Sequence, residues 1–405
     1  TATIRNPGYL KLELMIRGVK ISRQALGCAE IERRIKLSKE TGAALEFEIV
    51  LPENVLVNIP VLECLAEDRP YTLIEEGSRF YIVGRDEKVE VWIPSLPEFY
   101  DKKTTSGVPM VEIGRAYAGY LAISPTPVCE FIKQDIACHY CDLESKKGRA
   151  WTVDEVVETV EAALDEGAAE FVCLNVGYTD TADGGIALLE PYIRAIKKKF
   201  DALVCVQAQP PGEDKWIDAT YAMGVDSIAY NIEVYDTKLF SRIAPGKLRL
   251  LGRDRYFEAL RYAAKIFPSS AVVTNLIIGL ESIESTNKGI SNLTAMGVIP
   301  TLPIYRMGFD ENMDSAKLLG DVAPIYVHLQ QSLKRNKLSP TWISHFNLAL
   351  NAIDGHFFGG EAPLQQKWQR VLKSKHGGRI AHSISNFRRR LRVRSVDDDS
   401  TPSGF

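Results

Sequence analysis

The chain has 405 residues, of which 49 are Lys or Arg and 52 are Asp or Glu, so its formal net charge at pH 7 is -3. This near-balance creates no overall field that would favour nucleic acid or an anionic membrane surface. No apolar run reaches membrane-spanning length, and the N-terminal residues lack the apolar stretch of a signal peptide. Seven cysteines without the pattern of a secreted disulfide framework favour a cytoplasmic protein. Together with the charge balance and the lack of long apolar runs, this predicts no membrane and no nucleic-acid partner.

The N-terminal part, residues 1–110, is predicted to be a β-rich α+β extension. Short alternating or β-branched runs, separated by Gly and charged residues, are typical of strands and hairpins. These runs cover residues 10–21, 44–51, 54–59, 71–84 and 88–94. One helix is predicted at 28–41, and the Pro-, Gly- and Thr-rich segment 95–109 is predicted to be a connector.

Residues 115–312 alternate between apolar strands and amphipathic helices. Strands are predicted at 120–124, 170–177, 203–209, 227–234, 271–279 and 299–306. The helix predicted at 152–166 begins with a capping box, formed by Thr152 and Glu155. Nearly continuous apolar strands separated by helices indicate a parallel α/β sheet of six βα units. Residues 313–405 are predicted to be a helical C-terminal region, with helices at 314–334 and 340–353 and a basic and acidic tail.

Three closely spaced cysteines follow the first of these strands. Eight residues separate Cys129 from Cys138, and two separate Cys138 from Cys141. Three thiolates suit an iron–sulfur cluster that keeps one iron open, whereas a closed zinc site needs four ligands. Two alternatives stay open, namely ordinary buried thiols and a zinc site with His139 as fourth ligand. The zinc reading requires the adjacent residues Cys138 and His139 to converge on one ion.

The ending Cys-His-Tyr-Cys of this motif resembles the C-x-aromatic-C ending of the radical S-adenosylmethionine (SAM) superfamily. The usual motif of that family is CxxxCxxC, so the first gap is longer here, at a small entropic cost for the loop. The resemblance covers residues 115–310 and is to biotin synthase-like and hydrogenase-maturase-like members. It implies a partial (βα)6 TIM-type barrel, a [4Fe–4S] cluster on the three cysteines, and SAM on the fourth iron.

The same resemblance implies seven residues that contact SAM: Tyr140, Asn175, Gly177, Asn231, Glu233, Arg242 and Ile278. Asn175 and Gly177 stand where the family usually has Gly-Gly-Glu, so the match there is one of position. Asn231 and Glu233 are two apart on a strand and therefore point to the same face. Arg242, in an R-x-x-P-G segment, suits the SAM carboxylate because its planar fork binds carboxylates bidentately. The alternatives are an Arg242 on a solvated helix face and an Ile278 in a plain buried strand.

The reaction implied by the resemblance is reductive cleavage of SAM to a 5′-deoxyadenosyl radical, which abstracts hydrogen from a small-molecule biosynthetic substrate. Gln207, Gln209 and Tyr305 are predicted to face that substrate, because active sites lie at the C-terminal ends of barrel strands. A flavodoxin- or ferredoxin-type electron donor is the implied partner. Radical SAM methyl or carbon transfer is one alternative, and a non-catalytic zinc- or metal-binding barrel is another. The sequence carries no signal for an oligomeric state.

Overall fold

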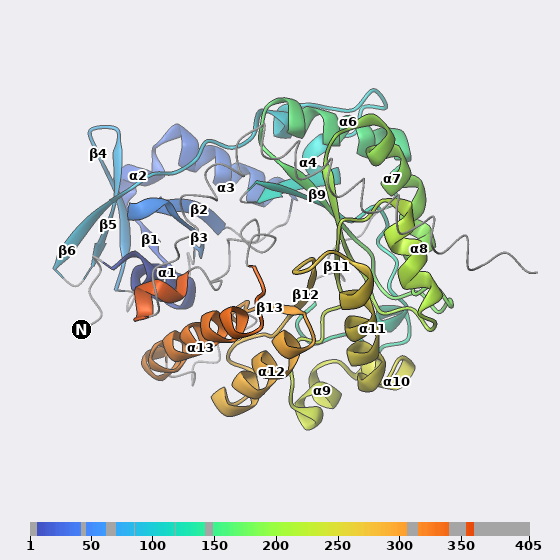
Figure 1. Cartoon of the computed structure of the whole chain (residues 1–405). Coiled ribbons are helices and arrows are strands. Elements are labelled where there is room, and N and C mark those ends of the chain that lie inside the picture. Colours follow the sequence, from blue (N-terminus) through green and yellow to red (C-terminus); the bar gives the residue numbers. More distant parts are fainter. Residues whose placement is uncertain are drawn as a thin grey trace, which may run out of the picture.

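The computed structural model describes residues 6–41, 46–61, 70–84, 86–117, 119–141, 149–305, 315–339 and 354–359. Its centre is a seven-stranded sheet in the order β13-β12-β11-β10-β9-β8-β7 (Figure 1). The strands are β7 (Gly114–Tyr117), β8 (Tyr120–Ile123), β9 (Phe171–Asn175), β10 (Leu203–Gln207), β11 (Ser227–Ala229), β12 (Val272–Asn275) and β13 (Ile299–Thr301). Strands β8 to β13 run parallel, and β7 pairs with β8 in the antiparallel direction. The predicted partial (βα)6 barrel is therefore confirmed.

Helices connect the parallel strands, and the longer ones lie along the outside of the sheet (Figure 1). They are α5 (Glu130–Lys133), α6 (Val153–Asp165), α7 (Ile186–Lys199), α8 (Lys215–Met223), α9 (Thr237–Ile243), α10 (Pro245–Leu250), α11 (Arg253–Ile266) and α12 (Ile283–Ala295). The predicted capping box is present at α6, where the Thr152 side chain accepts from the Glu155 amide and Glu155 bonds back to the Thr152 amide.

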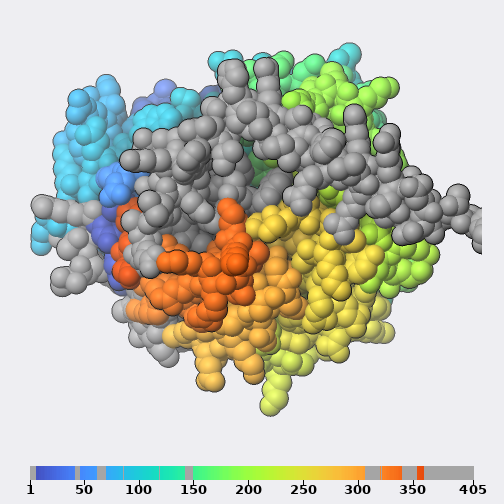
Figure 2. Space-filling model, in the orientation of Figure 1, coloured from blue at the N-terminus to red at the C-terminus, as the bar shows by residue number. Residues whose placement is uncertain are grey.

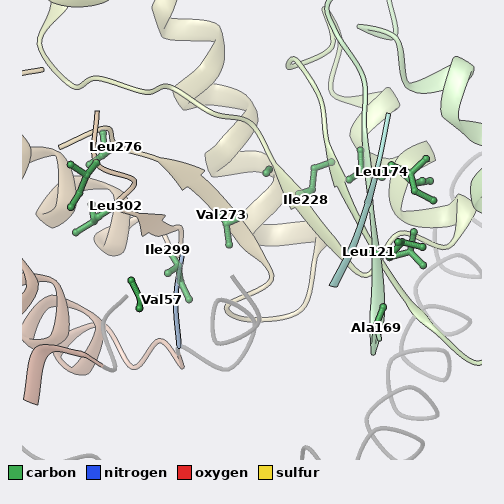
Figure 3. Close-up of a cluster of buried hydrophobic side chains, with 14 of the residues drawn as sticks. Val57, Leu121, Ala169, Leu174, Ile228, Val273, Leu276, Ile299 and Leu302 are labelled. Carbon is green, nitrogen blue, oxygen red and sulfur yellow. The ribbon is translucent and has the colours of Figure 1, made fainter. Parts of the chain in front are cut away.

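The N-terminal part contains a separate small sheet and a hairpin. The sheet has the order β1 (Lys20–Ile21), β4 (Thr72–Glu76), β5 (Arg79–Gly84) and β6 (Glu87–Val91), and β2 (Glu46–Leu51) pairs with β3 (Val55–Pro60). Short helices complete it: α2 (Arg23–Leu26), α3 (Ala29–Thr41), η1 (Pro52–Asn54), η2 (Glu98–Asp101) and α4 (Met110–Ile113). Its core is continuous with that of the barrel, since Val57 belongs to one hydrophobic cluster with Leu121 and Ile299 (Figure 3).

The prediction of a strand at residues 10–17 is wrong, because these residues form helix α1 (Pro7–Arg17). Asn6 caps the helix by accepting from the amides of Gly8 and Tyr9, and Pro7 suits the first helical turn. Lys11 and Glu13 are buried, so this helix lacks the separate polar face by which a surface helix is recognised in a sequence.

The C-terminal part packs on α1 and on the barrel. Helix α13 (Ser315–Arg335), predicted at 314–334, contacts both α12 and α1, and its orange residues lie between the blue and yellow parts in Figure 2. The helix predicted at 340–353 and the charged tail lie outside the described residues. The η5 turn (Asp354–Phe358) contacts α1, and Lys11 Nζ lies 3.0 Å from Asp354 Oδ2, with both side chains buried. Among the described helices, none is both long and apolar enough to cross a bilayer.

The Lys11–Asp354 ion pair links residues that are 343 positions apart, so we predict that Lys11→Met is strongly destabilising. Removing one partner leaves a buried carboxylate without this cation, which costs about 3–5 kcal/mol of the free energy of unfolding. Lys11→Met combined with Asp354→Leu should recover most of that loss, because well-packed apolar residues replace buried ion pairs at little cost. Urea denaturation of the three proteins measures this, and an unchanged midpoint for Lys11→Met would contradict it.

Candidate functional site

The three cysteines lie on the loop after β8, at the C-terminal end of the parallel sheet. Cys129 is buried and occupies the position before the first turn of α5. Cys138 and Cys141 belong to one tight turn, in which the Cys141 amide donates to the Cys138 carbonyl at 3.0 Å. Cys129 and Phe131 belong to one buried cluster, and the half-buried Cys138 packs against it.

Gly177, at the end of β9, allows the start of this loop to pack directly against it. A Cβ atom on Gly177 would lie 2.3 Å from the Val128 carbonyl oxygen and 2.7 Å from Cys129 Cβ. The Glu130 amide donates to the Tyr178 carbonyl at 2.8 Å, and the rings of Phe131 and Tyr178 stack 4.5 Å apart. The position of Cys129 is thus fixed by the end of β9, and glycine is needed there for steric reasons.

Gly246 allows the other side of the loop to pack against the junction of α9 and α10. The His139 amide donates to the Ile243 carbonyl at 2.9 Å, and the Gly246 amide donates to the Ile136 carbonyl at 3.1 Å. A Cβ atom on Gly246 would lie 2.6 Å from the Ile136 oxygen and 2.7 Å from the Phe131 ring. The Pro-Gly of the predicted R-x-x-P-G segment therefore clamps the cysteine loop from outside.

A buried charged pair lies behind this clamp. Lys247 Nζ is 3.4 Å from Glu233 Oε1 and donates to the Asn231 carbonyl at 2.6 Å. The ammonium also lies over two aromatic rings, 5.5 Å from the centre of Tyr140 and 5.4 Å from that of Tyr256. Glu233 follows β11 with a φ of +65°, a left-handed conformation that non-glycine residues rarely adopt.

Burial dominates the electrostatics of these groups. It raises the pKa of Glu233. The positive charge of Lys247 and hydrogen bonds from neighbouring side chains lower that pKa in part. Burial also raises the pKa of Tyr140 well above its ordinary value, and the negative charge of Glu233 adds to that increase. The Tyr140 hydroxyl is buried and has no hydrogen-bond partner of its own, which costs free energy unless a ligand completes the site.

Polar side chains cover the C-terminal ends of the strands, and apolar ones fill the barrel below them. Asn175 and Gln207 are register partners on β9 and β10, and the Tyr256 hydroxyl donates to Gln209 Oε1 at 2.5 Å. Two residues deeper, Cys173 and Cys205 are buried register partners. Tyr120 and Phe171 stack beneath them at 5.6 Å. The end of the barrel away from the cysteine loop is thus filled by side chains.

The structure brings most of the predicted site residues to this end. Asn231 accepts from the Asn275 amide at 3.1 Å, and Ile278 is buried where its carbonyl accepts from the Tyr305 amide at 2.9 Å. Arg242, by contrast, is exposed on α9. The assignment of each residue to SAM or substrate stays a prediction.

Sequence reasoning missed Lys247, Tyr256 and Asn275. Asn275 ends an apolar strand in the same way as Asn175, so the rule used for Asn175 applied equally to it. Lys247 directly follows the Pro-Gly pair, a visible signal for its proximity to the loop. Tyr256 lies within α11, and no local pattern separates it from an ordinary core residue.

The described residues do not form a closed site for a single metal ion. Among the described residues, no three His, Cys, Asp or Glu side chains converge closely enough to bind one metal ion, and His139 is exposed. The geometry therefore does not favour the zinc alternative. A [4Fe–4S] cluster makes a different demand, because each thiolate binds a different iron and the sulfur atoms stay apart.

Comparison with known proteins decides the family. The profile of the Radical SAM superfamily matches residues 123–287, which include all three cysteines and the pair Glu233 and Lys247. Residues 123–287 are therefore a radical SAM domain. This confirms the predicted family and enzyme class and, with them, a [4Fe–4S] cluster and SAM as the cofactors of that class.

The curated relatives are distant and match only in part. Bacteriochlorophyllide c C-7(1)-hydroxylase of Chlorobaculum limnaeum is 28% identical over 98 residues, 24% of each chain. Mitochondrial lipoyl synthase of Branchiostoma floridae is 25% identical over 166 residues, 40% of this chain and 43% of the relative. The chain thus spans less than half the length of these relatives. A crystal structure of methylornithine synthase superposes with a TM-score of 0.42 at 14% identity, over 61% of this chain and 71% of that one.

The residues present fit the cofactors of a radical SAM enzyme. Three thiols lie on one loop that two glycine contacts hold against the strand ends. The orphaned hydroxyl of Tyr140, next to the third cysteine in sequence, marks a polar position that a bound group can complete. Cys129, Cys138 and Cys141 are the residues that would hold the cluster.

We predict that Gly246→Ala releases the clamp on the cysteine loop. The new methyl group would overlap the Ile136 oxygen and the Phe131 ring, so the loop has to move and reconstituted iron per chain should fall by more than half. Gly320→Ala is the control, since its added Cβ meets no atom within 4 Å and alanine favours a helix by about 1 kcal/mol. Iron analysis after anaerobic reconstitution measures both, and equal iron in the two variants would contradict the role of the clamp.

Proposed function

We propose that this chain cleaves SAM reductively and abstracts a hydrogen atom from a small-molecule biosynthetic substrate. When bound, the cluster supplies one electron and SAM supplies a 5′-deoxyadenosyl radical, the chemistry of this cofactor pair. The observation that carries the proposal is the clamped three-cysteine loop, which stands above a layer of polar strand ends in a barrel whose other end is packed. The protein contributes binding, orientation and the exclusion of water.

The polar groups around Glu233 are proposed to hold the amino-acid and ribose parts of SAM. Glu233 and Asn231 follow β11, and the buried hydroxyl of Tyr140 is close enough to Glu233 for the two groups to affect each other's pKa. Asn175 and Gly177 lie at the neighbouring strand end, and Ile278 supplies a buried apolar surface suited to adenine. Arg242 remains a candidate for the carboxylate, from an exposed position that requires its side chain to turn inward.

The substrate is proposed to bind between the strand ends and the cluster loop. Gln207 and Gln209 are half-buried at the end of β10 and offer amide groups to a polar ligand. Tyr305 is also half-buried, and its amide bonds to Ile278 at 2.9 Å, next to the surface proposed for adenine. A substrate held there lies near SAM, which shortens the path for hydrogen transfer. The electron is proposed to come from a flavodoxin- or ferredoxin-type donor.

We predict that changing any one of Cys129, Cys138 and Cys141 to Ala removes most of the bound iron. Each thiolate is proposed to bind a separate iron, so the loss of one leaves two irons without a protein ligand. The wild type should bind about four irons and four sulfides per chain after anaerobic reconstitution. Cys28→Ala is the matched control, because Cys28 is a free, half-buried cysteine in the N-terminal part. Full iron content in Cys129→Ala would show that Cys129, which precedes the long first gap, is not a ligand of the cluster.

We predict that the reconstituted protein forms 5′-deoxyadenosine from SAM and dithionite under anaerobic conditions. 5′-Deoxyadenosine should form slowly without substrate and faster with a true substrate. In Glu233→Gln, the affinity for SAM should fall by about 2 kcal/mol, because charge-assisted hydrogen bonds are lost. Chromatography measures the product, and deuterium transfer from labelled candidates identifies the substrate. S-adenosylhomocysteine without deoxyadenosine would indicate methyl transfer instead. If the chain binds zinc and forms neither product, it is a non-catalytic metal-binding barrel.

A further inference from the structure

Lys247 is a fixed positive charge inside the protein. Its side chain is 3% exposed, and it is held by Glu233, by the Asn231 carbonyl and by the faces of two tyrosine rings. An ammonium over aromatic rings at less than about 6 Å gains cation–π attraction, which helps to hold the side chain in this position. Because the side chain is almost fully buried, bulk water screens its field only weakly.

Stability alone does not account for this arrangement. Buried ion pairs cost desolvation that often cancels their attraction, so an apolar pair would serve the fold equally well. The Lys197–Asp226 pair offers a contrast, because Asp226 also accepts from the Val204 amide at 2.8 Å and so anchors a strand. Glu233 instead has a strained backbone, and the Tyr140 hydroxyl lies close enough to affect its pKa.

The geometry directs the charge of Lys247 toward the cysteine loop. Lys247 directly follows Gly246, whose amide binds Ile136 of that loop at 3.1 Å. Its ammonium lies over Tyr140, which stands between Cys138 and Cys141 in sequence.

We propose that Lys247 is a positioning residue whose buried charge makes the cysteine-bound cluster easier to reduce. The proposal rests on the proposed function, because it assumes a cluster on the three cysteines. In the reduction step one electron passes from the reduced flavodoxin- or ferredoxin-type donor to the cluster, with no bond formed and no proton transferred. The added negative charge lies close to the ammonium in a poorly screened site. The positive charge therefore stabilises the reduced cluster more than the oxidised cluster.

The test compares midpoint potentials of reconstituted proteins without SAM, by redox titration monitored with electron paramagnetic resonance. In Lys247→Met we expect the reduction equilibrium to fall by about tenfold, which is 59 mV for one electron. Lys247→Arg should stay near the wild type because it keeps the charge. Glu233→Gln should shift the potential upward, because it removes the opposing negative charge. Lys197→Met, which removes the half-buried lysine of another ion pair, should leave the potential unchanged.

Opposite shifts in Lys247→Met and Glu233→Gln support the proposal, since a merely structural role would not give opposite signs. If Lys247→Met does not retain a cluster, Glu233→Gln and Lys247→Arg decide the question by the same criteria. An unchanged potential in Glu233→Gln, or in a cluster-containing Lys247→Met, overturns the proposal. Loss of SAM affinity with unchanged potential makes Lys247 a SAM ligand instead. A wild type without iron would overturn the proposed function itself, which is a separate outcome.

Discussion

Close packing of backbone against the cysteine loop is the constraint on which the rest of the site depends. Gly177 and Gly246 lack the Cβ atoms that would strike Val128, Cys129, Ile136 and Phe131, so the loop is held between the end of β9 and the start of α10. A loop with eight residues between its first two cysteines has many conformations to lose. Contacts from both sides reduce that freedom before any cofactor binds. The longer spacing thus coexists with a defined position for each thiol.

The same packing sets the chemistry of the surroundings. The α9–α10 junction that holds the loop also carries Lys247 into the interior, where it meets Glu233 and the Tyr140 ring. Tyr256 joins this group to Gln209, so a connected polar network extends from the cysteine loop to a strand end that is proposed to face substrate. Networks of this kind hold side chains in single orientations because each member satisfies another. The apolar floor of Tyr120 and Phe171 closes the barrel beneath it.

The barrel was predictable because its pattern is local and repeated. Apolar strands, the capping box at Thr152 and the helix lengths each indicate βα units without knowledge of distant contacts. Helix α1 was not predictable in this way, since Lys11 and Glu13 are buried by residues more than 50 positions away. The three cysteines proposed as ligands were visible from their spacing and neighbours. Lys247 was not identified, because its burial depends on how α10 packs against the loop, and Arg242, which the motif suggested, lies exposed.

Mössbauer spectroscopy of ⁵⁷Fe-reconstituted protein, with and without SAM, tests the central claim most directly. The claim is that three cysteines bind one cluster and leave a single iron for SAM. It predicts that SAM changes the signal of one iron site and leaves the other sites unaltered. A spectrum that is identical with and without SAM, in protein that contains the full cluster, would contradict the account.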